Sequence, residues 1–572
     1  MVITLLIWCF VFIVSCGYGQ TILQFLKFNP ENEHPPYYPS HLVPIFFIGF
    51  IFCNVLASII NLFVPIRILA FFIITLPGFL FFLKWIRSRN SNYIFKPITS
   101  GISQFLYITT GLCLLLFTLW LTSGAIKNAD TYIYHAQSIH WIESYPVIIG
   151  LGNFFNRLAY NSGWFVQNAL FSFSFLGGRS FHVLNGLLLF IISMFFIMEF
   201  ILAFKKHEIG LPQIWGLTII PLGIISIGTQ ASAPSTDMPV AYLSWMAAYL
   251  CMRFIKQENS FLSIFIISGI ITFAFTIKIS IAPLFFIPAF LILMKIKAIK
   301  FKNMLSVFIW VGLIILPWMI RNVIISGYAV YPSASTALPV EWRIPTSLVK
   351  EDAMGIQAFG FYERATQEEV MDKPFFERIK FWYYNLTLNQ KMMVLVSLFT
   401  PIILGIISFI SFLNHKFLLS KYEMITITGF FGGFLFWVFV SPNLRFGYVY
   451  ILFLFSICVS AAIFWIISVF NLTQKTIGSI GFFGLTILMI VLFARSFNFN
   501  DFKNRYLFPL DYDHRSTQPC LIDEGQVTIF CASEYGECGY HSFPCHAWGN
   551  ENVRMYGDKL QDGFYLDYPN VD

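Results

Sequence analysis

The chain has 572 residues, of which 57% are hydrophobic and only 11% are charged. Because about a quarter of the residues in soluble globular proteins are charged, this composition excludes a water-soluble enzyme. The 19% of aromatic residues also excludes a disordered or fibrous protein, since so much apolar surface is not tolerated in water outside a fold. The sequence predicts an all-α protein that crosses a lipid bilayer many times.

A run of about 20 apolar residues crosses the hydrocarbon core as a helix, and we count about 14 such runs. They lie near residues 3–26, 42–62, 66–86, 103–123, 183–204, 212–230, 239–255, 260–277, 280–296, 304–325, 391–412, 422–440, 446–469 and 477–495. We predict three regions: additional helices over 1–101, a membrane domain over 102–495, and a C-terminal tail over 496–572.

Basic residues cluster between the runs on one side of the predicted membrane, which the positive-inside rule assigns to the cytoplasm. The clusters are Arg87, Arg89 and Lys96; Lys205 and Lys206; Arg253 and Lys256; Lys295, Lys297, Lys300 and Lys302; Lys416 and Lys421; and Lys475. The net charge of +7 therefore reflects topology, and no nucleic-acid partner is predicted. With 14 alternating crossings, both termini, the loops 124–182 and 326–390 and the tail face the periplasm of a bacterial inner membrane.

The tail contains four of the ten cysteines, Cys520, Cys531, Cys538 and Cys545. On an exported segment, paired disulfides are the default state of cysteines. The sequence does not distinguish the three possible pairings. A zinc site that combines these cysteines with His541 or His546 is the competing interpretation.

The two long exported loops are the next features along the chain. The loop 124–182 predicts a short helix over 130–145 and an interfacial amphipathic stretch over 164–176. The loop 326–390 opens with a Pro- and Ser-rich turn region and continues as an amphipathic stretch over 363–384. Long exported loops without low complexity are usually functional.

Two acidic residues lie at the exported ends of predicted helices, and each has two interpretations. Asp130, with Tyr134 one helical turn later, could accept a proton from a hydroxyl group, or it could cap the loop helix. Asp237 is followed by Pro239 and is also explained by a helix cap.

Three cations share this exported side. Lys278 stands alone between two spans, where it would either reach for the interface or neutralise a phosphate. Arg321 lies within a span and requires a protein acid or a ligand anion. Arg445 carries a planar, permanent charge that suits a phosphate diester or a pyrophosphate. We expect these cations and the two acids to converge in one cavity that opens away from the cytoplasm.

These residues occur in short motifs that resemble, in order, those of the GT-C superfamily of polytopic membrane glycosyltransferases. The matching positions are Asp130 with Tyr134 and Ala136, residues 236–239, residues 276–278, residues 317–332, and Pro442 with Arg445. His135, His140 and residues 540–545 also resemble an uncharacterised bacterial group of membrane proteins. The first three spans and the cysteine tail depart from the common pattern of the superfamily.

The resemblance implies a GT-C-like helical bundle that moves a sugar from a polyprenyl-phosphate donor to an envelope glycan or lipid, with inversion. Asp130 would be the general base, and Asp237 would orient the acceptor or support Asp130. Lys278, Arg321 and Arg445 would bind the donor phosphate. No cofactor is implied with certainty, although Asp237 could help to hold a divalent cation.

The residues near Asp130 that could support it also have alternative interpretations. His135 would tune Asp130, or it would be a hydrogen-bonded structural residue. His140 and Tyr134 are further supporting candidates. The competing functions are an O-antigen-type polymerase or ligase that uses a diphosphate-linked lipid, a polysaccharide transporter or flippase, and an inactive assembly subunit.

Overall fold

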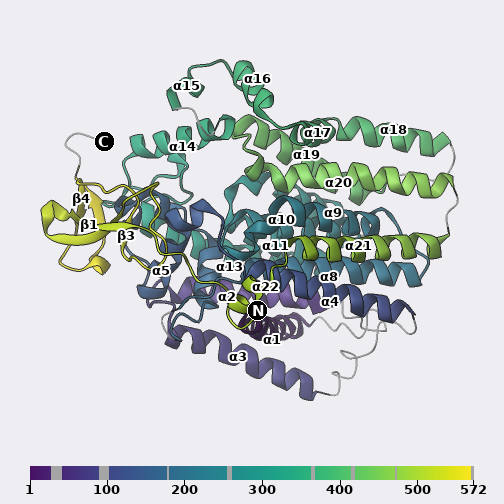
Figure 1. Ribbon diagram of the computed structural model, residues 1–572, viewed down its shortest axis with the longest axis horizontal. Helices are drawn as coiled ribbons and strands as arrows, with labels where there is room; N and C mark the ends of the chain where they lie inside the picture. The colour runs from purple at the N-terminus through teal and green to yellow at the C-terminus, as the bar shows by residue number, and fades with distance from the viewer. Residues whose placement is uncertain are drawn as a thin grey trace.

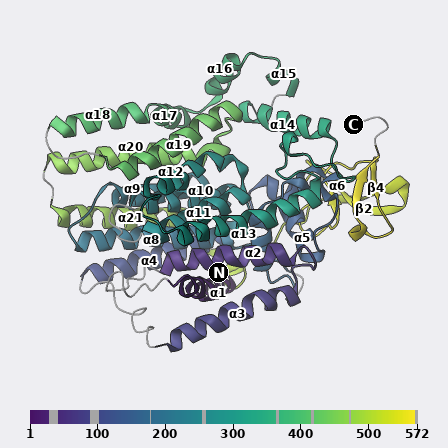
Figure 2. The ribbon, with the colours of Figure 1, turned by 180° about the vertical axis from the view of Figure 1, so that it is seen from behind.

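The computed structural model describes residues 1–27, 42–88, 102–176, 179–253, 260–362, 367–413, 419–470 and 473–567. Within these ranges the protein is a bundle of long helices with a small β region at one end (Figures 1 and 2). Four basic residues of the predicted topology lie outside the described residues: Arg89, Lys96, Lys256 and Lys416. Residues 363–366, at the start of the predicted amphipathic stretch, also lie outside them.

Every predicted apolar run lies on a helix. The helices are α1 (Val2–Phe25), α2 (Leu42–Ile60), α3 (Ile68–Arg87), α4 (Ile102–Thr122), α8 (Leu184–Lys205), α9 (Leu211–Ile227), α10 (Asp237–Met252), α11 (Ser260–Ile277), α12 (Phe286–Lys295), α13 (Phe301–Ser326), α17 (Leu388–Leu398), α18 (Thr400–Leu413), α19 (Lys421–Val440), α20 (Leu444–Val469) and α21 (Gln474–Ser496).

The number of full spans is smaller than the sequence predicts. Among the described residues, 8 helices are long and apolar enough to cross a membrane, or up to 10 if two bent helix pairs each count as one span. Among the described residues, full spans are thus fewer than the 14 or so that the sequence predicts. Three further apolar helices are described over only 10–17 residues each: Tyr107–Thr122, Phe261–Ile277 and Ile279–Lys295. The chain is a multi-pass membrane protein by helix length and hydropathy.

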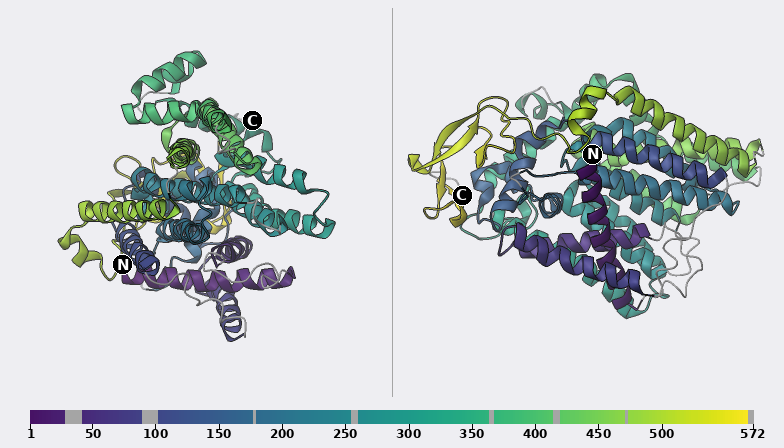
Figure 3. Two further views of the ribbon diagram at one scale, coloured as in Figure 1. Left: turned by 90° about the vertical axis from the view of Figure 1, so that its right-hand side faces the viewer. Right: turned by 60° about the horizontal axis from the view of Figure 1, so that its bottom comes forward.

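Helix α1 runs across α2 and α3 instead of along them (Figure 3). Glycines permit this crossing, because a Cβ atom on Gly17 would lie 1.9 Å from the carbonyl oxygen of Gly78, and one on Gly49 would lie 1.8 Å from that of Ser15. Helix α1 is nevertheless among the helices that are long and apolar enough to cross a membrane. The amino group of Met1 donates to the carbonyl oxygen of Arg505 at 2.7 Å, so the N-terminus lies beside the start of the tail.

The first long loop folds into short helical segments between α4 and α8. They are η4 (Thr131–His135), α5 (Ala136–Ser144), α6 (Leu151–Phe154), η5 (Asn156–Ala159) and α7 (Gly163–Leu170). Together η4 and α5 confirm the helix predicted over 130–145. All residues of α7 are buried, and this helix packs against α2, α5 and α11, so the prediction of an interfacial stretch there is wrong. Its aromatic residues fill the protein interior.

The second long loop and the tail lie at the same end of the bundle as the first loop (Figure 1). The loop contains η9 (Ala334–Thr336), α14 (Thr346–Phe361), α15 (Gln367–Met371) and α16 (Phe375–Asn385). The tail contains α22 (Phe499–Arg505), β1 (Thr517–Ile522), β2 (Val527–Ala532), β3 (Cys545–His546), β4 (Val553–Met555) and β5 (Phe564–Leu566). The fold is thus not entirely α-helical.

The strands of the tail form two small sheets. Strand β2 pairs with β1 in antiparallel and with β3 in parallel orientation, and β4 pairs with β5. Disulfides join Cys520 to Cys531 and Cys538 to Cys545. They confirm the predicted disulfides and remove the thiolates that the alternative zinc site would require.

Candidate functional site

The site begins at Asp130, which lies where α4 gives way to the loop helices. The helix that follows opens with the π-helical turn η4, a widened geometry that is frequent at functional sites. The Asp130 side chain makes no capping hydrogen bond. Its Oδ2 atom instead accepts a hydrogen bond from an NH2 group of Arg445 at 2.6 Å. The geometry therefore does not support the cap as an explanation of this residue.

Arg445 lies in the first turn of α20, where the side chain of Asn443 caps the helix. Its Nε atom is 3.2 Å from Oδ2 of Asp237, so one guanidinium contacts both acids. This second contact is an ion pair without hydrogen-bond alignment, so the Nε–H group makes no hydrogen bond within the described part of the chain. Arg445 therefore bridges the two acids and retains a donor for a further acceptor.

Asp237 is the first residue of α10, and its side chain is only 7% exposed. Lys278, in extended backbone between α11 and the 3-10 helix η8 (Ile279–Phe285), donates a hydrogen bond from Nζ to Oδ1 of Asp237. The Lys278 ammonium also lies 4.1 Å from the ring centroid of Phe446, which adds a cation–π contact. Breaks in the helices thus allow polar backbone and charged side chains to meet beside the bundle.

Asp130, Asp237, Lys278 and Arg445 line one cavity of about 780 Å³. Another part of its lining is polar as well: Arg157 pairs with Asp352 at 3.3 Å, and Tyr331 donates a hydrogen bond to the same carboxylate at 3.0 Å. Other parts of its wall are apolar or aromatic. These residues include Ile356 and Phe359 of α14, Phe436 and Val440 of α19, and Trp548 of the tail.

The sequence analysis did not identify a second polar group of the cavity, around Asp352. Arg157, Tyr160 and Tyr331 line the cavity, and Tyr160 and Tyr331 both donate hydrogen bonds to Asp352. One sequence signal was available, since Arg157 is the only Lys or Arg between residues 128 and 178. Asp352 lies almost 200 residues later in an amphipathic helix, and nothing in its local sequence distinguishes it from a solvated acid.

The supporting candidates Tyr134 and His135 lie beside the four charges. Tyr134 lines the cavity, and burial followed by the nearby charge of Asp130 raises the pKa of its hydroxyl. His135 is buried behind it, and Thr131 Oγ1 lies 3.2 Å from its Nδ1 atom. Burial lowers the pKa of His135 to about 4, so its ring is neutral at physiological pH. His135 therefore adds no positive charge to the site.

His140 belongs to the contact between the first loop and the tail. Its ring stacks on Phe543 with centroids 3.9 Å apart, and its Nδ1 atom lies 3.1 Å from the carbonyl oxygen of Tyr540. On the same helix, Gln137 donates to the carbonyl oxygens of Gly539 and Ser542 at 2.9 and 2.8 Å. The tail is docked on the loop that carries Asp130, and His140 takes part in that docking.

The buried His546 of the docked tail makes the stability of the tail depend on pH. The buried Nδ1 atom of His546 accepts hydrogen bonds from two backbone N–H groups, and burial lowers the pKa of His546 from 6.5 to about 4. Between these values the unfolded chain binds the proton more readily, so the stability from neutral His546 is lost as pH falls from 6.5 towards 4. We expect a loss of about 3 kcal/mol. In His546→Asn, whose amide oxygen can accept the same bonds, thermal unfolding of the tail should depend less on pH across this window.

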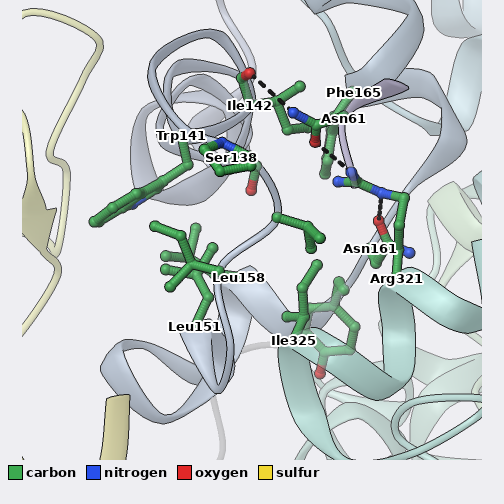
Figure 4. Close-up of a pocket in the computed structure, with 14 residues that line it drawn as sticks. Asn61, Ser138, Trp141, Ile142, Leu151, Leu158, Asn161, Phe165, Arg321 and Ile325 are labelled. Atoms are coloured by element: carbon green, nitrogen blue, oxygen red, sulfur yellow. Dashed lines mark hydrogen bonds between the residues drawn. The ribbon is translucent and has the colours of Figure 1, made fainter. Parts of the chain in front are cut away.

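Arg321 does not join the other four charges. Its side chain lines a separate small pocket, where Nε donates to Oδ1 of Asn161 at 3.2 Å and NH1 donates to Oδ1 of Asn61 (Figure 4). No acid forms an ion pair with Arg321 among the residues that the structure describes. The convergence expected for five residues therefore holds for four.

The described residues contain no group of three or more His, Cys, Asp or Glu side chains that could hold a metal ion. Both acids of the cavity have cationic partners instead. The observed chemistry is thus a bridged acid–base cluster of two carboxylates, one ammonium and one guanidinium, with an aromatic and apolar wall.

Fold and site together define a multi-pass helical membrane protein with a charged cavity at one end of the bundle. A family model described as Domain of unknown function (DUF8201) matches residues 1–452, and the chain belongs to this family. The match includes Asp130, Asp237, Lys278 and Arg445 and ends before the disulfide-bonded tail. Comparisons with curated proteins and with solved structures find no match.

Proposed function

We propose that this protein is a membrane glycosyltransferase that moves a sugar from a polyprenyl-phosphate donor to a hydroxyl group of an envelope glycan or lipid. The observation that carries the proposal is the meeting of Asp130, Asp237, Lys278 and Arg445 in one cavity with an apolar wall. A lipid-linked sugar phosphate needs both environments, because its chain is apolar and its phosphate is anionic.

Lys278 and Arg445 are the proposed phosphate ligands. An ammonium and a planar guanidinium both bind phosphate oxygens through charge-assisted hydrogen bonds. Among the described residues, no group accepts a hydrogen bond from the buried Nε–H of Arg445, so a phosphate oxygen that displaced Oδ2 of Asp237 could accept it. Asp237 is more buried than Asp130 and holds both cations, which suits a positioning role.

Asp130 is the proposed general base. Its side chain is 27% exposed and faces the cavity, where an acceptor hydroxyl could approach. A phosphate that binds Arg445 would compete for the guanidinium that Asp130 now holds and would release the carboxylate. Asp130 would then take the hydroxyl proton while the acceptor oxygen bonds to the anomeric carbon. The bond between that carbon and the phosphate oxygen breaks, and polyprenyl phosphate leaves with its charge stabilised by the cations.

The wall formed by α14 and α19 is the proposed path of the lipid chain. Phe359, Phe436 and Val440 line the cavity there and are also exposed on the surface of the helices. Phe436 and Val440 lie on α19, a candidate membrane span, so their exposed faces would contact lipid and a chain could pass from the bilayer to the cavity along this wall. The acceptor would then approach the polar part of the lining near Arg157 and Tyr331.

The test uses purified full-length protein and a set of polyprenyl-phosphate sugars in mixed micelles. We expect release of polyprenyl phosphate with one of these donors and an acceptor extract. In Arg445→Gln, donor affinity should fall about tenfold to a hundredfold, since charge-assisted hydrogen bonds contribute about 1.5–3 kcal/mol.

Two matched variants complete this experiment. Arg445→Lys keeps the charge without the planar fork and should fall between wild type and Arg445→Gln. Arg495→Gln removes an exposed arginine near the end of α21 and should bind donor like wild type. Movement of the lipid-linked sugar across vesicles without cleavage of its phosphate bond would contradict the proposal and favour a flippase.

A further inference from the structure

The disulfide-bonded tail contributes one aromatic side chain, Trp548, to the wall of the large cavity. Among the described residues, Trp548 is the only residue of the tail that lines this cavity. The residue is 63% exposed, so its indole ring is not covered by the fold in the way that core tryptophans are. An aromatic ring in this place offers a ligand a flat apolar surface beside polar groups.

Contacts on several sides hold the Trp548 ring in place. It meets the ring of Phe155 edge to face, with centroids 5.6 Å apart and an angle of 72° between the planes. A Cβ atom on Gly536 would lie 3.0 Å from three atoms of the indole, so the backbone passes directly beside the ring. The backbone N–H of Trp548 also donates to Nδ1 of His546 at 3.1 Å. A ring that is held in advance loses little conformational entropy when a ligand binds.

The polar group around Asp352 belongs to the same cavity wall. Phe155, which contacts Trp548, immediately precedes η5, and η5 carries Arg157. The Arg157 side chain is 34% exposed. The one hydrogen bond that it makes within the described ranges goes from NH1 to the hydroxyl of Tyr160, at 3.1 Å. Because a guanidinium has several N–H donors, Arg157 retains donors for a ligand in the cavity.

Tyr134 connects this polar group to the proposed base. It lines the cavity one helical turn after Asp130, and its ring centroid lies 6.2 Å from that of Tyr160. The cavity volume of about 780 Å³ is within the range of pockets that hold drug-sized ligands. The cavity therefore has room for a sugar between Trp548 and Asp130 as well as for a phosphate at Arg445.

We propose that Trp548 and Arg157 bind the acceptor and that this acceptor is the sugar end of a glycan chain. A pyranose ring has a face of C–H groups, which stacks on the indole, and hydroxyl groups, which accept hydrogen bonds from Arg157. An acceptor without a sugar ring would use neither group in this way. The inference rests on the proposed sugar transfer and specifies its acceptor.

The first test measures sugar transfer by the full-length protein while the acceptor concentration is varied. In Trp548→Ala, the KM for a glycan acceptor should rise about tenfold, as expected for the loss of an aromatic stacking contact, while the KM for the donor stays unchanged. Trp548→Phe keeps a smaller ring and should fall between wild type and Trp548→Ala. The matched control is Tyr556→Ala, which removes an exposed aromatic residue of the tail outside the cavity and should keep the wild-type KM values.

The second test needs no sugar transfer. It measures binding of neutral oligosaccharides of glucose, mannose, galactose and N-acetylglucosamine to the full-length protein by saturation-transfer NMR, without any donor. We expect wild type and Tyr556→Ala to bind at least one of them and Trp548→Ala to bind it about tenfold more weakly. Oligosaccharide binding that depends on Trp548, in a protein that transfers no sugar, would contradict the proposed function but support the glycan site. Equal oligosaccharide binding by wild type and Trp548→Ala, no binding by wild type, or transfer with an unchanged acceptor KM in Trp548→Ala would overturn the inference.

Discussion

The Asp130→Asn variant is expected to lose sugar transfer by about 10²- to 10⁴-fold while it still binds the lipid-linked donor. Asparagine keeps the size of the side chain and an oxygen that can accept a hydrogen bond from Arg445, so the cluster around the cation is retained. It cannot take a proton from an acceptor hydroxyl. The measurement pairs an initial-rate assay with a donor-binding assay on the same purified protein.

The control for this experiment is Asp501→Asn, which neutralises an exposed acid on α22 and should transfer at the wild-type rate. A base is also expected to leave a signature in the pH profile of the wild-type enzyme, namely an acidic limb that reports protonation of the carboxylate. Asp130→Asn should remove that limb from its residual rate. If transfer proceeds unchanged in this variant, Asp130 is not the base, even where the donor specificity is as proposed.

Sequence hydropathy located the helices well but could not count the spans. Each apolar run became helical because a bilayer forces the backbone to satisfy its own hydrogen bonds. Hydropathy does not record direction, so the apolar run over 3–26 predicted a helix without showing that α1 runs across α2 and α3. Gly17 and Gly49 could be read only as flexible residues until the neighbouring backbones were placed. Similarly, the aromatic residues of α7 indicated burial without saying whether protein or headgroups would surround them.

For the site, the sequence predicted that residues more than 300 positions apart share one cavity, and Asp130 and Arg445 both line it. Asp130 and Arg445 were each notable because charge is rare near membrane helices. Their contact, and the bridge from Arg445 to Asp237, depend on long-range packing that no local pattern encodes. The same reason explains the misplacement of Arg321, whose position within a span was correct although its side chain points to a different pocket.

The tail was the least predictable part of the fold. Its strands are short, with two to six residues each, so their alternation of polar and apolar side chains is too brief to identify. The cysteines predicted disulfides but not their pairing. Docking on the first loop relies on groups such as Gln137, whose amide reaches residues about 400 positions away. Only the folded chain brings these groups together.

Glu143 is the buried acid on which this docking depends. Ser180 donates to its Oε1 atom at 2.9 Å, and the hydroxyl of Tyr540 in the tail donates to its Oε2 atom at 2.6 Å. Burial raises the pKa of Glu143, but hydrogen bonding and the charge of His182 outweigh burial and hold the pKa below 4.5. The stabilisation is thus fully present above pH 4.5 and is lost as pH falls through the lowered value.

We expect Glu143→Ala to release the tail at a cost of about 3–5 kcal/mol, because it leaves buried donors without their charged acceptor. Limited proteolysis should then cut within residues 511–546, which wild-type protein protects. Glu143→Gln keeps an acceptor oxygen and should lose less of the docking free energy. The exposed-site variant Glu551→Ala should resist the protease like wild type.

The docked tail also contacts the segment that carries Asp130, because the N–H group of Gly539 donates to the carbonyl oxygen of Tyr132, two residues from Asp130. An undocked tail should therefore also slow sugar transfer. If the tail is released but sugar transfer proceeds at the wild-type rate, docking does not position Asp130.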